Sequence, residues 1–169
     1  LVWTSIPTVM PAPAPDLIVG QEDLEHCFSN GSSETDSPNA SRLSNPSAVW
    51  SDGMRLVISD NNNNRVLIWN NLPAARNFEP ANVVLGFASM EDQDEFSAPT
   101  DRTLRNPEGV HSDGTSLAVA DSFNNRVLIW NSFPTSNFQA ASVVIGQPTF
   151  NQRRPAGLDP EEVPPTNSR

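Results

Sequence analysis

Short apolar runs of four or five residues recur along the chain, separated by clusters of Gly, Pro, Asn, Asp and Ser. Val and Ile are frequent in these runs, which favours the pleated surface of a β-strand. The first group of runs predicts four strands, at residues 47–50, 55–59, 65–69 and 82–85. The second group predicts four more, at residues 108–111, 116–120, 126–130 and 142–145. No stretch shows the 3.6-residue apolar stripe of a packed helix.

Turn residues connect the predicted strands in the same way in both groups. Asp52 and Gly53 separate the first two strands of the first group, and Asp113 and Gly114 do so in the second. Asp-Gly is a strong hairpin signal because both residues tolerate positive φ. An Asn-rich turn then joins the second strand to the third. Each group therefore predicts one four-stranded antiparallel sheet.

The two groups are copies of one repeat. The octapeptide NNRVLIWN occurs at residues 63–70 and again at residues 124–131. Upstream, NPSAVWSDGMRLVISDNN aligns with NPEGVHSDGTSLAVADSF, and downstream VVLG aligns with VVIG. A partial third copy, LVWTSIPTVMPAPAPDLIVGQ, opens the chain and aligns with VLIWNNLP and the VVLG end. Repeats that cannot bury both faces alone stack on their neighbours. The sequence therefore predicts stacked sheets that present the same strands to similar neighbours.

The combined pattern NP-x-x-V-x-x-DG-x-x-L-x-V-x-D-x-x-NNRVLIWN, followed by LP and VVLGQ, resembles the NHL-repeat β-propellers, and more narrowly a bacterial version of them. The resemblance covers residues 1–21, 45–86 and 106–150. It implies an all-β fold, a β-propeller of four-stranded antiparallel blades with about two and a half NHL-like blades present. It also implies that the chain is a fragment of a larger propeller, or that further blades come from another chain.

Six segments follow from the alignment. Residues 1–21 are expected to form a half blade of third and fourth strands, and residues 45–87 and 106–150 to form complete blades. Inter-blade loops are expected at residues 22–44 and 88–105. Residues 151–169 are expected to be a tail or a linker to a further blade.

Composition narrows the function mainly by exclusion. The chain has 20 acidic and 10 basic residues, a net charge of −10, and every basic residue is Arg. Binding to nucleic acid usually needs a basic face, so RNA binding, which some NHL domains perform, is disfavoured and no nucleic-acid partner is expected. No apolar run approaches the ~20 residues that span a bilayer, so no membrane span is expected. The polar loops, the missing lysine and the resemblance to NHL-repeat proteins together suggest an extracellular or cell-envelope location.

Polar turns and long loops should emerge together at one end of the stacked sheets. Binding residues usually lie on such loops when a rigid scaffold carries them. Phe123 replaces Asn62 in the second copy, so it breaks the repeat at this end. The candidate ligand-binding residues are Asn61, Asn62, Asn63, Ser122, Phe123 and Asn124.

Asp60 and Arg65 recur as Asp121 and Arg126. Such pairs could clamp a ligand, and the neighbouring Asn oxygens could hold calcium. Recurrence in both copies favours structural pairs, because a functional site is seldom copied into every repeat. The Asn run also suits a turn that needs left-handed backbone geometry. We therefore expect no cofactor and no metal, with calcium as the alternative.

Catalytic groups form no clear constellation. The wider NHL family includes a peptide-amidating lyase that binds zinc through several histidines, whereas this chain has only His26 and His111, in unlike positions. Catalytic zinc usually has three protein ligands. His111 replaces Trp50, which predicts a partly buried strand residue, and His26 is expected on a surface loop beside the single cysteine, Cys27. A GxSxG elbow and a Gly-rich phosphate loop are both missing.

The leading expectation is a non-enzymatic propeller scaffold that binds a protein or peptide, with carbohydrate as the other ligand class. The alternative is part of a propeller lyase or hydrolase whose catalytic residues lie in blades outside this sequence.

Overall fold

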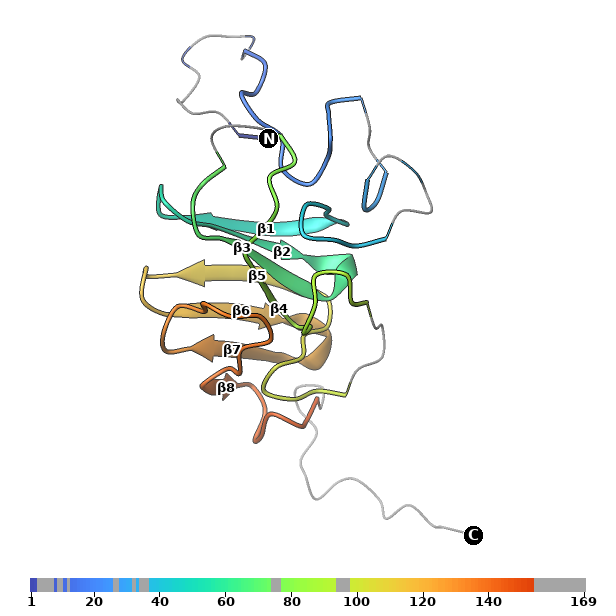
Figure 1. Ribbon diagram of the computed structural model, residues 1–169. Coiled ribbons are helices and arrows are strands. Elements are labelled where there is room, and N and C mark those ends of the chain that lie inside the picture. Colours follow the sequence, from blue (N-terminus) through green and yellow to red (C-terminus); the bar gives the residue numbers. More distant parts are fainter. Residues whose placement is uncertain are drawn as a thin grey trace.

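The computed structural model describes residues 1–2, 8, 11, 13–25, 28–31, 33, 37–73, 77–93 and 98–153. Over these residues the chain is all-β, with two four-stranded antiparallel sheets and two single-turn 3₁₀-helices. The two sheets stack as layers, and the N-terminal segment lies beyond the first of them (Figure 1). The sheets do not close into a ring within the described part of the chain.

Both sheets have their strands in sequence order. The first contains β1 (Pro46–Ser51), β2 (Leu56–Asp60), β3 (Arg65–Trp69) and β4 (Val83–Leu85). The second contains β5 (Pro107–Ser112), β6 (Leu117–Asp121), β7 (Arg126–Trp130) and β8 (Val143–Ile145). The 3₁₀-helices η1 (Asn61–Asn63) and η2 (Ser122–Asn124) join the second strand of each sheet to the third. Each predicted strand begins and ends within one residue of the observed strand, so the predicted pair of four-stranded sheets is confirmed.

Strand register is the same in the two sheets. Leu67 pairs with Ile58 on one side and Val84 on the other. Leu128, its counterpart, pairs with Val119 and Val144. Because side chains alternate between faces along a strand, an identical register places corresponding residues on corresponding faces. The two sheets are therefore structural copies as well as sequence copies.

One apolar cluster lies between the two sheets and holds them together. The first sheet contributes one face, and the second sheet contributes the face that carries Leu117, Leu128 and Trp130. Fully burying one such side chain contributes about 1.5–3 kcal/mol. The first-sheet residues in this cluster are Val57, Val66, Ile68, Val83 and Leu85.

The opposite face of the first sheet is also covered. Leu56, Leu67 and Trp69 pack there with Leu43 from the preceding loop and with Val19 from the N-terminal segment. Strands β2 and β3 are consequently buried at every position. In the second sheet β6 and β7 alternate between buried and half-buried residues, because none of the described elements covers the outer face.

The N-terminal segment forms an isolated antiparallel bridge between Val2 and Leu17. This bridge aligns in the repeat with the pairing of Ile68 and Val83 in the first sheet. The described residues of this segment contain no full strand, and the half blade expected at residues 1–21 stays a prediction.

The expected partial burial of His111 is wrong, because its side chain is exposed. His111 pairs with Ala118 across β5 and β6, and directly opposite residues share one face of a sheet. That face is the uncovered one of the second sheet. Its counterpart Trp50 lies between the sheets, 5.9 Å from the ring of Phe133. His26 and Cys27 lie outside the described residues.

The hairpin turns depend on their aspartates. One carboxylate oxygen of Asp52 accepts hydrogen bonds from the backbone N–H groups of Met54 (3.0 Å) and Arg55 (2.6 Å). The other accepts from the Arg55 guanidinium at 2.9 and 2.7 Å. These bonds stabilise the charged carboxylate, chiefly through the backbone and side chain of Arg55, and lower the pKa of Asp52 from 3.8 to about 2.

We therefore expect the carboxyl group of Asp52 to titrate near pH 2 in the folded protein. Since its pKa in the folded state is below that in the unfolded chain, its stabilising effect is fully present above about pH 4 and is lost as the pH falls toward 2. NMR titration of the Asp52 carboxyl carbon and the Arg55 amide measures the pKa of Asp52. The Asp52→Asn substitution should remove the loss of stability that protonation of Asp52 causes at low pH. A measured pKa near 3.8 would contradict the geometry.

Candidate functional site

The predicted ligand-binding triplets form η1 and η2, at one end of the stacked sheets. Asn62 and Phe123 are exposed there, and Ser122 is half-buried. Each 3₁₀-helix ends on a left-handed asparagine, Asn64 with φ 54° and Asn125 with φ 52°. Asn tolerates this backbone region better than most residues, so turn geometry explains the asparagines at positions 64 and 125.

The other three predicted residues, Asn61, Asn63 and Asn124, are buried. Asn61 donates its side-chain amide to the Pro107 carbonyl oxygen at 3.1 Å and accepts a hydrogen bond from the Asn106 amide at 3.2 Å. Both partners belong to the second repeat. Asn61 therefore joins the two sheets.

Asn63 and Asn124 have a shared role within their own repeats. The amide of Asn63 donates to Asp60 at 2.8 Å, and the amide of Asn124 donates to Asp121 at 2.9 Å. Asn63 also forms two hydrogen bonds, of 2.6 and 3.1 Å, with the side chain of Asn30, which lies in the loop before the first sheet. These contacts orient the aspartates beneath each turn.

The Asp60 and Arg65 side chains form a fully buried ion pair, with Nε of Arg65 2.7 Å from Oδ2 of Asp60. The remaining guanidinium donors bond the carbonyl oxygens of Asn39 (2.9 Å), Arg42 (2.8 Å) and Met90. Arg65 thus ties the loop before the first sheet to the loop after it. Burial raises the pKa of Asp60, and the guanidinium opposes that rise.

Asp121 and Arg126 repeat this arrangement, again fully buried and 2.7 Å apart. Arg126 donates to the carbonyl oxygen of Thr103 at 2.9 Å, in the loop before the second sheet. It also donates to the carbonyl oxygen of Phe150, which follows that sheet. Both Asp–Arg pairs are therefore part of the framework that holds the loops, and neither faces solvent.

Metal ligation and membrane insertion each have a specific structural requirement. Within the part of the chain that the structure describes, no three or more His, Cys, Asp or Glu side chains are grouped so as to hold a metal ion. Among the same residues no helix has the length and apolar character needed to cross a bilayer.

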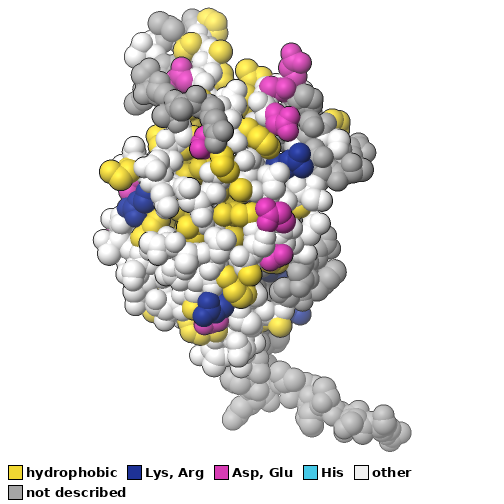
Figure 2. Space-filling model, viewed as in Figure 1, with side chains coloured by type: hydrophobic (Ala, Val, Ile, Leu, Met, Phe, Trp, Pro, Cys, Tyr) yellow, Lys and Arg dark blue, Asp and Glu magenta, His cyan; other side chains and the backbone are white. Residues whose placement is uncertain are grey.

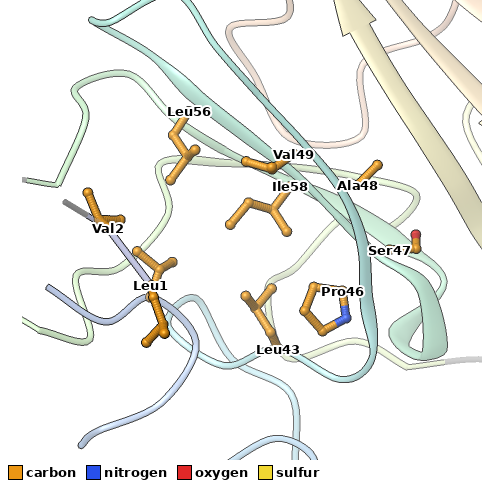
Figure 3. A pocket seen from close by; sticks show the side chains of 10 residues that line it. Leu1, Val2, Leu43, Pro46, Ser47, Ala48, Val49, Leu56 and Ile58 are labelled. Atoms are coloured by element: carbon orange, nitrogen blue, oxygen red, sulfur yellow. The ribbon is translucent and has the colours of Figure 1, made fainter. Parts of the chain in front are cut away.

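An apolar groove lies between the N-terminal segment and the first sheet. It has a cavity volume of about 270 Å³. Figure 3 shows side chains from the N-terminal segment on one side and from β1 and β2 on the other surrounding a common space. Leu1 and Val49 are each 66% exposed here. The lining residues are Leu1, Val2, Val19, Leu43, Pro46, Ser47, Ala48, Val49, Leu56 and Ile58.

A second hollow of about 480 Å³ continues the groove toward the turns. The two share Val19, Leu43 and Pro46 as lining residues. The second hollow is more polar and reaches Phe28 and the predicted ligand-binding residue Asn62. Hydrophobic side chains also gather in the middle of the molecular face seen in Figure 2. One continuous depression therefore connects an apolar floor with one residue of the predicted binding end.

Sequence reasoning missed the groove. Its walls come from two segments about forty residues apart in the chain, and no local pattern marks their meeting. The one usable signal in the sequence is Val49, the apolar residue of the NP-x-x-V motif, which lies on the edge strand β1.

Comparison of the chain with protein-family models, with curated protein sequences and with solved structures finds no match.

Proposed function

We propose that this chain is a non-enzymatic scaffold of propeller type, whose sheets act as blades and whose apolar groove binds an extended segment of a protein or peptide. The observation that carries the proposal is the pair of large apolar side chains, Leu1 and Val49, that face an apolar groove while two-thirds exposed. Removing apolar surface from water contributes roughly 25 cal/mol per Å². A ligand with apolar side chains would supply that cover.

The form of the ligand follows from the strand beside the groove. β1 is the edge strand of the first sheet, and Pro46, Ala48 and Val49 of β1 line the groove. Edge strands offer backbone hydrogen-bonding groups, and extended peptides bind by adding to such edges. The groove would then hold the alternate side chains of the peptide. The aliphatic lining favours peptide over carbohydrate.

The test is direct binding of apolar-rich heptapeptides, selected on a peptide array and then titrated against the intact chain by calorimetry and NMR. We expect amide shifts to cluster at Leu43, Ala48 and Ile58. Val49→Glu should weaken binding at least about tenfold, because a carboxylate would enter an apolar site. Met54→Glu is the matched control, since Met54 is 67% exposed and lies outside the groove lining.

Two results would overturn the proposal. Shifts centred on η1 and η2, with Val49→Glu as tight as the unchanged chain, would place binding at the turns. Peptides that bind the Met54→Glu and Val49→Glu variants equally would show that the groove is not the site.

A further inference from the structure

A turn of the second repeat caps the outer strand of the first sheet. The backbone N–H of Val84 in β4 donates to the side-chain oxygen of Asn137 at 3.0 Å. In return, the backbone N–H of Phe138 donates to the Val84 carbonyl oxygen at 2.9 Å. Phe138 has φ 54°, so the turn holds a left-handed conformation that a bulky residue rarely adopts. The Asn-Phe turn thus satisfies both outward backbone groups of an edge strand.

The same contact occurs one repeat earlier in the stack. The N–H of Ile18 donates to the side-chain oxygen of Asn77 at 3.0 Å, and the N–H of Phe78 donates to the Ile18 carbonyl oxygen at 3.1 Å. Phe78 has φ 58°, matching Phe138. Residues 17–19 therefore occupy, against the first sheet, the place that β4 occupies against the second.

Strand β8 carries a third copy of this edge, centred on Val144. Val144 pairs with Leu128 as Val84 pairs with Leu67. Among the described residues, however, none brings an Asn-Phe turn to Val144. Its neighbours Val143 and Ile145 are 38% and 54% exposed, whereas their counterparts in β4 are 2% and 0% exposed.

The face behind β8 matches a face that the chain already buries. Val127 and Ile129 of β7 have the same residue types and register as Val66 and Ile68 of β3, which lie in the cluster between the sheets. In the second sheet these side chains are half-buried. Inside the chain, the sheet of the following repeat covers such a face, together with the Asn-Phe turn of that following repeat.

We propose that β8 and this outer face dock onto the first sheet of a second copy of the chain, head to tail. β8 of one copy takes the place of residues 17–19 in the next copy, and Val144 receives the turn formed by Asn77 and Phe78. Both surfaces belong to the chain itself, and the contact reproduces one that it already makes internally. Such a contact is heterologous, because different surfaces of the two copies meet.

Residues 17–19 then act as an internal cap that competes with docking. A tethered segment has an effective concentration in the millimolar range, so association between copies appears only at high protein concentration. Each copy carries a net charge of −10, and salt screens the repulsion between copies. Association should therefore strengthen as the ionic strength rises.

Light scattering on a sizing column tests the proposal with the intact chain. Loading concentrations from about 10 µM to about 1 mM span the range in which β8 of another copy should begin to compete with residues 17–19. We expect a mass of 18.4 kDa at the dilute end and multiples of it at the concentrated end, more so in high salt. A mass of 18.4 kDa throughout both series would overturn the proposal.

Two equivalent substitutions should act in opposite directions. Val144→Pro removes the outward N–H of β8 and should abolish association, whereas Ile18→Pro removes the equivalent donor of the cap and should lower the concentration for association about tenfold. Circular dichroism verifies folding, and Ile145→Glu replaces Val144→Pro if that variant fails to fold. Equal association of the Ile145→Glu variant and the unchanged chain, or no gain from a folded Ile18→Pro variant, would overturn the proposal.

These mass measurements are independent of the peptide titration, so either proposal can fail alone.

Discussion

Replacing Arg65 with methionine should lower the free energy of unfolding by about 3–5 kcal/mol. The substitution leaves the Asp60 carboxylate buried without its cation, and three backbone carbonyl oxygens lose the guanidinium as a donor. Urea denaturation with linear extrapolation measures the loss. Arg102→Met is the control, because both polar contacts of the Arg102 side chain are exposed: a pair with Asp101 at 3.8 Å and a hydrogen bond to the Phe138 carbonyl oxygen at 2.6 Å. Exposed pairs contribute about 1 kcal/mol or less.

The loss at Arg65 should also depend on pH. Burial raises the pKa of Asp60, and without Arg65 the carboxyl group holds its proton to a higher pH still. A folded state that binds more protons than the unfolded chain is stabilised as the pH falls. The Arg65→Met variant should therefore recover part of its stability relative to the unchanged chain on acidification. A loss no larger than that of Arg102→Met would show that the buried pair is dispensable.

Replacing Trp130 with alanine should cost about 3–5 kcal/mol, the usual range for a large buried side chain. Trp130 is 1% exposed and lies in the apolar cluster between the two sheets. Its indole N–H also donates to the Gln139 carbonyl oxygen at 3.0 Å. Thermal and urea unfolding of the variant measure the effect, and Met54→Ala at an exposed turn serves as the control.

Trp130→Phe separates packing from hydrogen bonding. Phenylalanine keeps much of the apolar volume but leaves the Gln139 oxygen without the indole donor, which should cost about 1–3 kcal/mol. If Trp130→Ala and Met54→Ala lost similar amounts of stability, the cluster between the sheets would not be what holds them together.

Strand positions could be predicted because their signals are local. Asp52 with Gly53 and the NNRVLIWN octapeptide encode a turn and a strand within a few residues, and register follows from the repeat. Burial at the turns could not be predicted, because it depends on distant partners. Asn61 looked like a ligand-binding residue, yet it bonds the carbonyl oxygen of Pro107, which is 46 positions away in the chain.

Which faces of the two sheets are covered could not be predicted from the sequence either. A run such as RVLIW is apolar on both faces in both repeats, and only the three-dimensional neighbours decide whether both faces are buried. The predicted burial of His111 is wrong for this reason, since none of the described elements covers its face of the second sheet. The groove escaped notice because Leu1 and Val49 come together only in the folded chain.

Because NNRVLIWN occurs twice, the rate of amide hydrogen exchange in one copy can be compared directly with the rate in the other. Intrinsic amide exchange with deuterated solvent is set by neighbouring side chains, so corresponding amides within the two octapeptides share nearly the same unprotected rates. Their environments differ, because β3 is buried at every position whereas β7 alternates between buried and half-buried ones. The ratio of measured rates at Ile68, which is buried, and Ile129, which is half-buried, therefore converts directly into a difference in opening free energy. The second sheet should exchange first, and the chain should fray from that end inward.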